Sequence, residues 1–358
     1  MPLLVIAFLC AVLSASCGSP LLSDAPGSRA FVYVTKQGTN DVSVYTLNND
    51  GSLSFLSLTS TGGGLAPQGI ATDALGRFAY VANRDSNSLS AFSIAASTGA
   101  LTYLGGYPTD AQPQLPVVDP SGRRIYVANK GASTVTAYSI NSSTGALTLI
   151  GARATGNAPI GMAIDASGSF AFVAGSGANT ISVHAIDSTT GALGAAQAYA
   201  AGSAPAQLAF DTVGSVLYAA NSGDGTVSVF SEAAGTGVLA LLQTAAAGAG
   251  ATGVAMAPDR SYVFVTNKTD STVSSYTVAG NGALTLQSTI AAPVTPLYPG
   301  VDSGSAFLVV PGNGDHGLAS YKIAPPPASA PLARSATGTA GPGTNPVAVL
   351  VARTFSTY

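Results

Sequence analysis

The side chains best able to bind or transform a ligand fall at two repeating positions in the sequence. One set follows a recurring tetrad of the type Tyr-Val-Ala-Asn and supplies charged groups: Arg84, Asp85, Lys130, Asp224, Lys268 and His316. The other set lies one or two residues after a recurring proline and supplies amides and a phenol: Gln68, Gln114, Gln207 and Tyr298. Together such groups could hold an anionic or hydroxylated ligand. These ten residues are candidates for one polar binding face, and the alternative is a solvated rim.

Histidine and cysteine chemistry is sparse in this chain. The two histidines, His184 and His316, lack the spacing of a zinc site, and only His316, beside Asp315, is considered as a general base. The only cysteines are Cys10 and Cys17, so residues 18–358 contain no thiol for disulfides or thiolate chemistry. We therefore expect no metal and no cofactor. The net charge of −3 argues against a nucleic-acid partner.

The candidate positions belong to an internal repeat of about 46 residues. Seven related tetrads occur: YVTK, YVAN, YVAN, FVAG, YAAN, FVTN and LVVP. They open at Tyr33, Tyr80, Tyr126, Phe172, Tyr218, Phe264 and Leu308. A second aromatic position follows each tetrad, and turns such as "TGALT" separate the apolar runs. The chain is therefore built from seven similar units.

Each unit predicts four short strands. They are typified by "IGMAID" (160–165), "RRIYVA" (123–128), "TVTAYSI" (134–140) and "ALTLIG" (146–151). Alternating apolar residues, 42 glycines and a charged fraction of only 8% favour strands and turns over helices. Four strands in a repeat of this length are typical of a propeller blade. The sequence thus predicts an all-β, seven-bladed β-propeller over residues 29–358, with four antiparallel strands per blade.

The two ends of the repeat region predict how the ring closes. The first unit, from Arg29, lacks an innermost strand, whereas the last continues to "NPVAVLVAR" at 345–353. We expect this C-terminal strand to pair beside residues 31–35 and to complete the first blade, which would remove two open sheet edges.

Residues that recur around a ring are more often packing than chemistry. We therefore interpret the tetrad aromatics as contacts between blades and His184 as a semi-buried substitute for a packing aromatic. Asp73, Asp119, Asp165 and Asp211 precede a glycine by three residues, which fits a type I turn. By contrast, the starts of the innermost strands and the loops after the tetrads share one face, because successive strands alternate in direction.

The tetrad, the "TGALT" turn and the spacing from proline to Asp-x-x-Gly resemble the lactonase-type seven-bladed propellers, known for their YVTN repeats. This resemblance covers about residues 29–353 and implies the propeller fold. It also implies a possible lactonase activity, such as that of the propeller-type 6-phosphogluconolactonases. The enzymes of this family resemble one another in a Gly-Pro-Arg-His pattern at an innermost strand. Here neither Arg nor His follows any of the marker prolines.

Two hypotheses for function follow. The first is a non-catalytic binding scaffold of the bacterial cell envelope, whose partner is an envelope protein, a glycan or a small ligand. The alternative is a hydrolase that acts on a sugar-acid lactone and uses Arg84, Lys130, Lys268 and His316. Lactone opening needs a general acid or base, and cations to hold an anionic substrate. We expect a monomer in either case.

The N-terminus predicts export. An apolar run at 3–13 is too short to span a bilayer and suits a secretory signal. "LSASC" places Cys17 at a site that resembles a bacterial lipoprotein cleavage point, so Cys17 would become the lipidated first residue. Residues 1–17 are thus predicted as a signal peptide and 18–28 as a flexible tether. The mature protein would be lipid-anchored, periplasmic or on the outer surface, or else secreted, and would touch a membrane only through that anchor.

Overall fold

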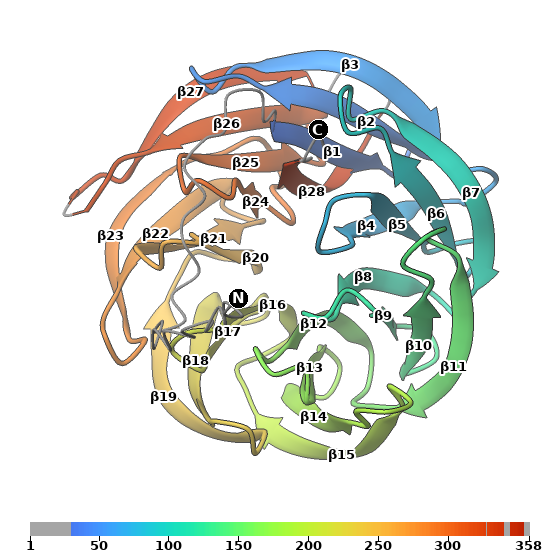
Figure 1. The fold of residues 1–358 in the computed structure, drawn as a ribbon. Helices are drawn as coiled ribbons and strands as arrows, with labels where there is room; N and C mark the ends of the chain where they lie inside the picture. Colours follow the sequence, from blue (N-terminus) through green and yellow to red (C-terminus); the bar gives the residue numbers. More distant parts are fainter. Residues whose placement is uncertain (1–29, 327, 340–343, 354–358) are drawn as a thin grey trace, which may run out of the picture.

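The protein is a closed ring of β-sheets. The computed structural model describes residues 30–326, 328–339 and 344–353. Over these ranges the chain forms 28 strands and no helix, and the strands make seven four-stranded antiparallel sheets around one axis (Figure 1). The predicted all-β, seven-bladed propeller is confirmed. The predicted leader, tether and Cys17 lie outside the described ranges.

Each sheet is one blade, numbered I to VII along the chain and read from its innermost strand outward. Blade I comprises β28 (Pro346–Arg353), β1 (Ala30–Lys36), β2 (Asp41–Leu47) and β3 (Leu53–Ser60). Blade II comprises β4 (Pro67–Thr72), β5 (Phe78–Asn83), β6 (Ser88–Ile94) and β7 (Leu101–Pro108). Blade III comprises β8 (Pro113–Val118), β9 (Arg124–Asn129), β10 (Thr134–Ile140) and β11 (Leu147–Ala154). Blades IV and V comprise β12 (Pro159–Ile164), β13 (Phe170–Gly175), β14 (Thr180–Ile186), β15 (Leu193–Ala200); β16 (Pro205–Asp211), β17 (Val216–Asn221), β18 (Thr226–Ala233), β19 (Val238–Ala246). Blades VI and VII comprise β20 (Ala251–Met256), β21 (Tyr262–Asn267), β22 (Thr272–Val278), β23 (Leu284–Ala291); β24 (Gly300–Val301), β25 (Phe307–Gly312), β26 (Gly317–Ile323), β27 (Leu332–Thr339).

One strand grouping from the sequence is wrong. Residues 160–165 were assigned with 123–151, but β12 pairs with β13 and opens blade IV. The innermost strand of blade III is instead β8, which pairs with β9. The predicted repeat runs from one tetrad to the next, so it begins one strand later than the blade does. For the same reason, no innermost strand precedes the first tetrad in the sequence.

The C-terminal strand closes the ring as predicted. β28 pairs antiparallel with β1, from Ala30 opposite Arg353 to Val34 opposite Val349, so blade I contains both ends of the described chain (Figure 1). The backbone of Tyr298 also hydrogen-bonds β28, because its N–H donates to Val347 and its carbonyl accepts from Val349. Blades VII and I are therefore joined by backbone hydrogen bonds as well as by side-chain packing.

Packing is concentrated between neighbouring blades. Seven of the eight buried clusters in the described residues lie at the boundaries between blades, one at each, and the tetrad aromatics contribute to six of these seven. Tyr80 is fully buried, and its hydroxyl donates a 3.0 Å hydrogen bond to the carbonyl of Gly145 in the next blade. Equivalent bonds run from Tyr33, Tyr126 and Tyr218 to Gly99, Gly191 and Gly282. The repeated tetrad thus binds each blade to the turn of the next.

The second aromatic position points to the preceding blade. The hydroxyls of Tyr276 and Tyr321 donate to the carbonyls of Ala246 and Ala291, at the ends of β19 and β23. His184 takes this place in blade IV, with no exposed surface. Its Nδ1–H donates to the Gly194 carbonyl and its Nε2 accepts from the Thr155 hydroxyl, each at 3.0 Å. The interpretation of His184 as a substitute for a packing aromatic is confirmed, but the residue is fully buried rather than semi-buried.

The repeated aspartates cap turns on the opposite face from the tetrad loops. The Asp73 carboxylate accepts hydrogen bonds from the backbone N–H groups of Arg77 and Phe78 at 2.6 and 2.9 Å. Gly76, three residues after Asp73, has a φ of +63° that favours glycine. Asp119 and Asp165 make the same pattern of bonds, so these carboxylates stabilise turns.

Candidate functional site

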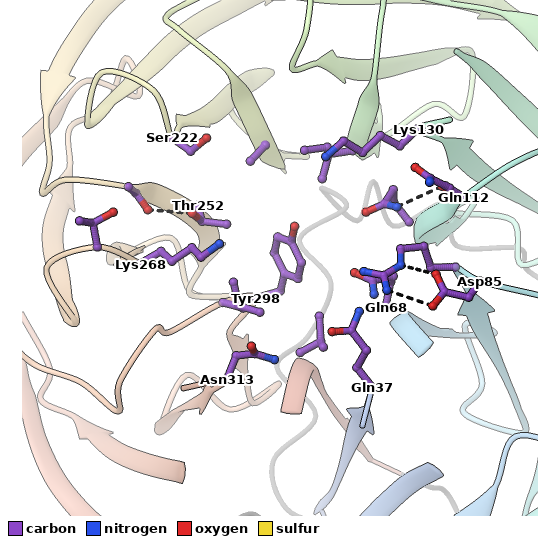
Figure 2. Close-up of a pocket in the computed structure, with 18 residues that line it drawn as sticks. Gln37, Gln68, Asp85, Gln112, Lys130, Ser222, Thr252, Lys268, Tyr298 and Asn313 are labelled. Carbon is purple, nitrogen blue, oxygen red and sulfur yellow. Dashed lines mark hydrogen bonds and ion pairs between the residues drawn. The ribbon is translucent and has the colours of Figure 1, made fainter. Parts of the chain in front are cut away.

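A pocket of about 730 Å³ lies on the axis of the ring, a size within the range of small-molecule sites. Two rings of positions line it (Figure 2). The inner ring is the second residue of each innermost strand, in β24's case of the segment that leads into it: Gln68, Gln114, Ile160, Ala206, Thr252, Leu297 and Val347. The outer ring is the residue after the tetrad, or in blade VII the second residue after it: Gln37, Arg84, Lys130, Ser222, Lys268 and Asn313. All seven blades therefore contribute to one site.

The inner ring is oriented by an unusual backbone position. The residue before the recurring proline, or before Ala251 in blade VI, has a positive φ in all seven blades: Ala66, Gln112, Ala158, Ala204, Gly250, Thr295 and Asn345. In three blades the carbonyl of this residue, Ala66, Gln112 or Gly250, accepts a hydrogen bond from the inner-ring side chain. Gln114 Nε2 donates to Gln112 at 3.0 Å, and Thr252 Oγ1 donates to Gly250 at 2.7 Å. Because the Gln114 amide nitrogen is held in this way, its amide oxygen remains an acceptor for a ligand.

The outer ring carries the charges of the pocket. Arg84 is paired with Asp85 through two hydrogen bonds, Nε to Oδ1 at 2.6 Å and Nη2 to Oδ2 at 3.1 Å. The guanidinium lowers the pKa of the Asp85 carboxyl below its usual value, so Asp85 stays ionised and the pair is neutral. Lys130 and Lys268 form no ion pair within the described ranges. The lining therefore carries two uncompensated positive charges.

Tyr298 lies near the axis, with its ring projecting into the pocket (Figure 2). Its side chain packs with Leu115, Val347 and Ala348, and it is 8% exposed. Its hydroxyl makes no hydrogen bond to any described residue, and burial raises the pKa of the phenol to about 12. The hydroxyl is thus protonated at neutral pH and can donate a hydrogen bond to a ligand.

The structure brings together seven of the ten residues predicted for the binding face: Gln68, Arg84, Asp85, Gln114, Lys130, Lys268 and Tyr298. The other three do not line the pocket. Gln207 turns away, and its Oε1 accepts from Val254 N–H at 2.9 Å. Asp224 accepts hydrogen bonds from Ser203 N–H and Thr226 Oγ1. Nδ1 of His316 accepts a hydrogen bond from Asn345 N–H.

Strand alternation explains why Gln207 and Tyr298 differ. Both stand two residues after the marker proline, and in β16 the preceding residue, Ala206, faces the pocket while Gln207 faces the next blade. In blade VII the innermost strand is reduced to Gly300–Val301, and Tyr298 lies in an irregular segment between Pro296 and Pro299. That segment bridges to Ala348 in parallel, which turns Tyr298 into the pocket.

Sequence reasoning missed the apolar and uncharged members of both rings. They include Ile160, Leu297 and Val347 in the inner ring and Gln37, Ser222 and Asn313 in the outer ring. Their equivalence with Gln68 or Lys130 within the repeat was the available signal. A search restricted to reactive side chains passes over such residues, although they shape the site.

In the parts of the chain that the structure describes, no three His, Cys, Asp or Glu side chains come together as a metal site. Those parts also hold no helix of the length and apolar character that crossing a membrane requires.

Comparison with known proteins places the chain among propellers. A family model described as "Lactonase, 7-bladed beta-propeller" matches residues 26–115, 116–209 and 195–303. No curated protein sequence matches significantly.

Similar solved structures cover nearly the whole ring. A "putative 6-phosphogluconolactonase" from Bacteroides fragilis is 21% identical, with a TM-score of 0.80 over 92% of this chain and 99% of that one. The periplasmic gluconolactonase of Pseudomonas aeruginosa is 18% identical, with a TM-score of 0.78 over 90% of this chain and 98% of that one. At such identities, the similarity shows the fold alone.

Proposed function

Because the chain belongs to the lactonase family of seven-bladed β-propellers, we propose that its axial pocket binds a small anionic, hydroxyl-bearing ligand without converting it. Fold membership leaves the reaction open, because function depends on the side chains that the scaffold presents. The pocket offers cations, amide oxygens and a phenol, which suit carboxylate and hydroxyl groups.

The composition of the inner ring carries this proposal. Its seven positions hold Gln, Gln, Ile, Ala, Thr, Leu and Val, none of which ionises. A hydrolase needs an acid or base with a pKa near the working pH, within reach of the scissile bond. The two acidic groups that line the pocket are poorly matched to that task, because Asp85 is held ionised by Arg84 and the pKa of Tyr298 is raised to about 12.

The second candidate function is hydrolysis of a sugar-acid lactone. It is favoured by the similarity of the fold to the periplasmic gluconolactonase of Pseudomonas aeruginosa. In that case Lys130, Lys268 and Arg84 would hold the anion, and Tyr298 would donate a hydrogen bond to the leaving oxygen.

Turnover of a panel of sugar-acid lactones, measured beside calorimetric binding of the corresponding acids, separates the two functions. The proteins are the wild type, Lys130→Ala as the pocket variant and His316→Ala as a control outside the pocket. Binding of an acid that weakens in Lys130→Ala, with no turnover above buffer, supports the binding function. Turnover that is lost in Lys130→Ala and kept in His316→Ala would instead establish the hydrolase.

We further propose that the protein is exported to the bacterial cell envelope through residues 1–17, with Cys17 lipidated. The apolar run and the "LSASC" sequence support this placement. Expression in a bacterial host with a radiolabelled fatty acid would label the wild type. The same label on Cys17→Ser would contradict lipidation, and retention of both proteins in the cytoplasm would contradict export.

A further inference from the structure

The pocket lining has a net positive charge. Asp85, the acidic side chain in the lining, is paired with Arg84. Other acidic residues in the same set of loops are held by backbone N–H groups of the pocket face: the carboxylates of Asp224, Asp270 and Asp315 accept from Ser203, Ala249 and Gly317. None of the three lines the pocket. Lys130 and Lys268 do line it, and neither donates a hydrogen bond to any part of the chain that the structure describes. A ligand with two negative charges would therefore match the lining.

The two lysines stand on opposite sides of the axis. Lys130 follows β9 of blade III and Lys268 follows β21 of blade VI, with two blades between them on one side of the ring and three on the other. Both ammonium groups project toward the centre from different sides, and the Tyr298 ring lies between them (Figure 2). An extended molecule with an anionic group at each end can pair with two cations placed in this way.

The wall between the lysines differs on its two sides. Blades I to III present four carboxamides, Gln37, Gln68, Gln112 and Gln114, whereas blades IV and V present Ile160 and Ala206 at the inner ring. The amide nitrogens of Gln68 and Gln114 donate to backbone carbonyls, which leaves their oxygens as acceptors. Hydroxyl groups are the donors that such oxygens can accept from. One edge of the ligand is therefore expected to carry hydroxyls.

We propose that the pocket holds an extended sugar diacid, with one carboxylate on Lys130, the other on Lys268 and its hydroxyls along the carboxamide wall. This inference rests on the proposed binding function and adds the number and placement of the ligand's charges. Each carboxylate would gain a charge-assisted hydrogen bond with a lysine that has no other partner in the described chain.

A matched pair of ligands tests the charge count. Glucarate and gluconate share a six-carbon polyol chain, and only glucarate has a carboxylate at both ends. By calorimetry on the full protein at fixed ionic strength, glucarate should bind about tenfold more tightly than gluconate, the effect of one added hydrogen bond to a charged group. Adipate, which lacks the hydroxyls, should bind about tenfold more weakly than glucarate.

Lysine variants of similar size locate the two charges. Lys130→Met and Lys268→Met should each bring the affinity for glucarate close to that for gluconate, and the double variant should bind neither. Lys322→Met, on an exposed position of β26 away from the pocket, is the matched control and should bind as the wild type does. Circular dichroism and the unfolding temperature of each variant show that the fold is retained.

The outcomes separate this inference from the function on which it rests. Equal affinities of the wild type for gluconate and glucarate would overturn the diacid and leave an anion-binding pocket. Adipate binding as tightly as glucarate would overturn the role of the carboxamide wall. Failure of all three acids to bind would overturn the proposed function itself.

Discussion

At the scale of single residues, the pocket depends on which charges are already paired. The Arg84 guanidinium donates two hydrogen bonds to the Asp85 carboxylate, so its charge is already compensated. Lys130 and Lys268 are left to bind a ligand. A carboxylate that is paired with its own loop thus controls how positive the site is.

Removing the Asp85 charge should therefore strengthen anion binding. Asp85→Asn keeps the shape of the side chain and releases the Arg84 guanidinium, so we expect affinity for gluconate or glucarate to rise about fivefold, as one partly exposed ion pair would give. Calorimetry at low and high salt checks this, and the gain should shrink in salt. Asp224→Asn, outside the pocket, is the control. Unchanged or weaker binding by Asp85→Asn would show that the pair itself is needed for the ligand.

His184 is the second residue with a testable role. Burial lowers the pKa of its imidazole, so the folded state keeps it neutral while the unfolded chain binds a proton below a pH of about 6.5. The unfolded state then binds more protons, and stability falls as the pH falls.

Replacing His184 by Tyr, the residue that occurs here in four other blades, removes this acid sensitivity. We expect similar unfolding temperatures for the two proteins at pH 8, and a higher one for His184→Tyr at pH 5. The acid-sensitive carboxylates are common to both proteins and cancel in the comparison. A difference between the proteins that does not change with pH would assign the effect to packing instead.

At the scale of elements, each blade is tied to its neighbours by hydrogen bonds that cross the boundary. The tetrad tyrosine reaches forward to the turn of the next blade, and the second aromatic reaches back to the outermost strand of the previous one. Blades IV and VI have Phe172 and Phe264 at the first tetrad position, so an aromatic side chain without a hydroxyl can also fill the space between two blades.

The value of the forward bond can be measured by Tyr80→Phe. This change leaves the Gly145 carbonyl without its buried donor, which should cost about 1 kcal/mol of unfolding free energy. Denaturant unfolding measures the loss. Tyr107→Phe is the control, because Tyr107 packs at the same boundary and its hydroxyl has no partner among the described residues. Equal effects of the two substitutions would argue that the hydrogen bond contributes nothing.

The sequence predicts elements better than it predicts which side chains face the axis. Tetrad spacing revealed seven blades, because the packing aromatics must recur at the same depth in each one. The starts of the innermost strands were located correctly, but Gln207 was chosen where Ala206 lines the pocket. That difference depends on which face of a strand points inward. In blade VII, Tyr298 stands at the position equivalent to Gln207, but the short and irregular innermost strand places it in the pocket. No repeat pattern could reveal this.

At the scale of the whole molecule, stability is expected to depend on the closure of the ring. Deletion of residues 346–358 removes β28, leaving β1 with an unpaired inner edge and removing the Tyr298 backbone partners. We expect loss of cooperative unfolding in all blades, seen as a broad, low-temperature transition by calorimetry. Deletion of 354–358 alone, which follows β28, should leave the transition sharp. A shortened chain without β28 that still unfolds cooperatively would show that six complete blades suffice.

Buried phenols make the fold sensitive to alkali. Burial raises the pKa of Tyr126 and Tyr276 to about 12, and it raises the pKa of seven more tyrosines: Tyr33, Tyr45, Tyr80, Tyr138, Tyr218, Tyr298 and Tyr321. Above a pH of about 10 the unfolded chain loses these protons while the folded chain keeps them. Each tyrosine then lowers stability by about 1.4 kcal/mol per pH unit.

We therefore expect a single steep alkaline unfolding transition between about pH 10 and pH 12. Tyrosinate absorbance near 295 nm should rise together with the loss of the circular dichroism signal. If most of the absorbance appeared while the dichroism stayed native, the buried phenols would be ionising inside the fold and this explanation would fail.

The pairing of β28 with β1 also sets an order in time. A ribosome makes β1 first and β28 last, so blade I cannot be assembled until nearly the whole chain has been synthesised. Blades II to VII are each continuous in sequence and can form as they emerge, while the first three strands wait. The ring can therefore close only in a chain that has been synthesised through β28, because a chain released earlier has no partner for the inner edge of β1.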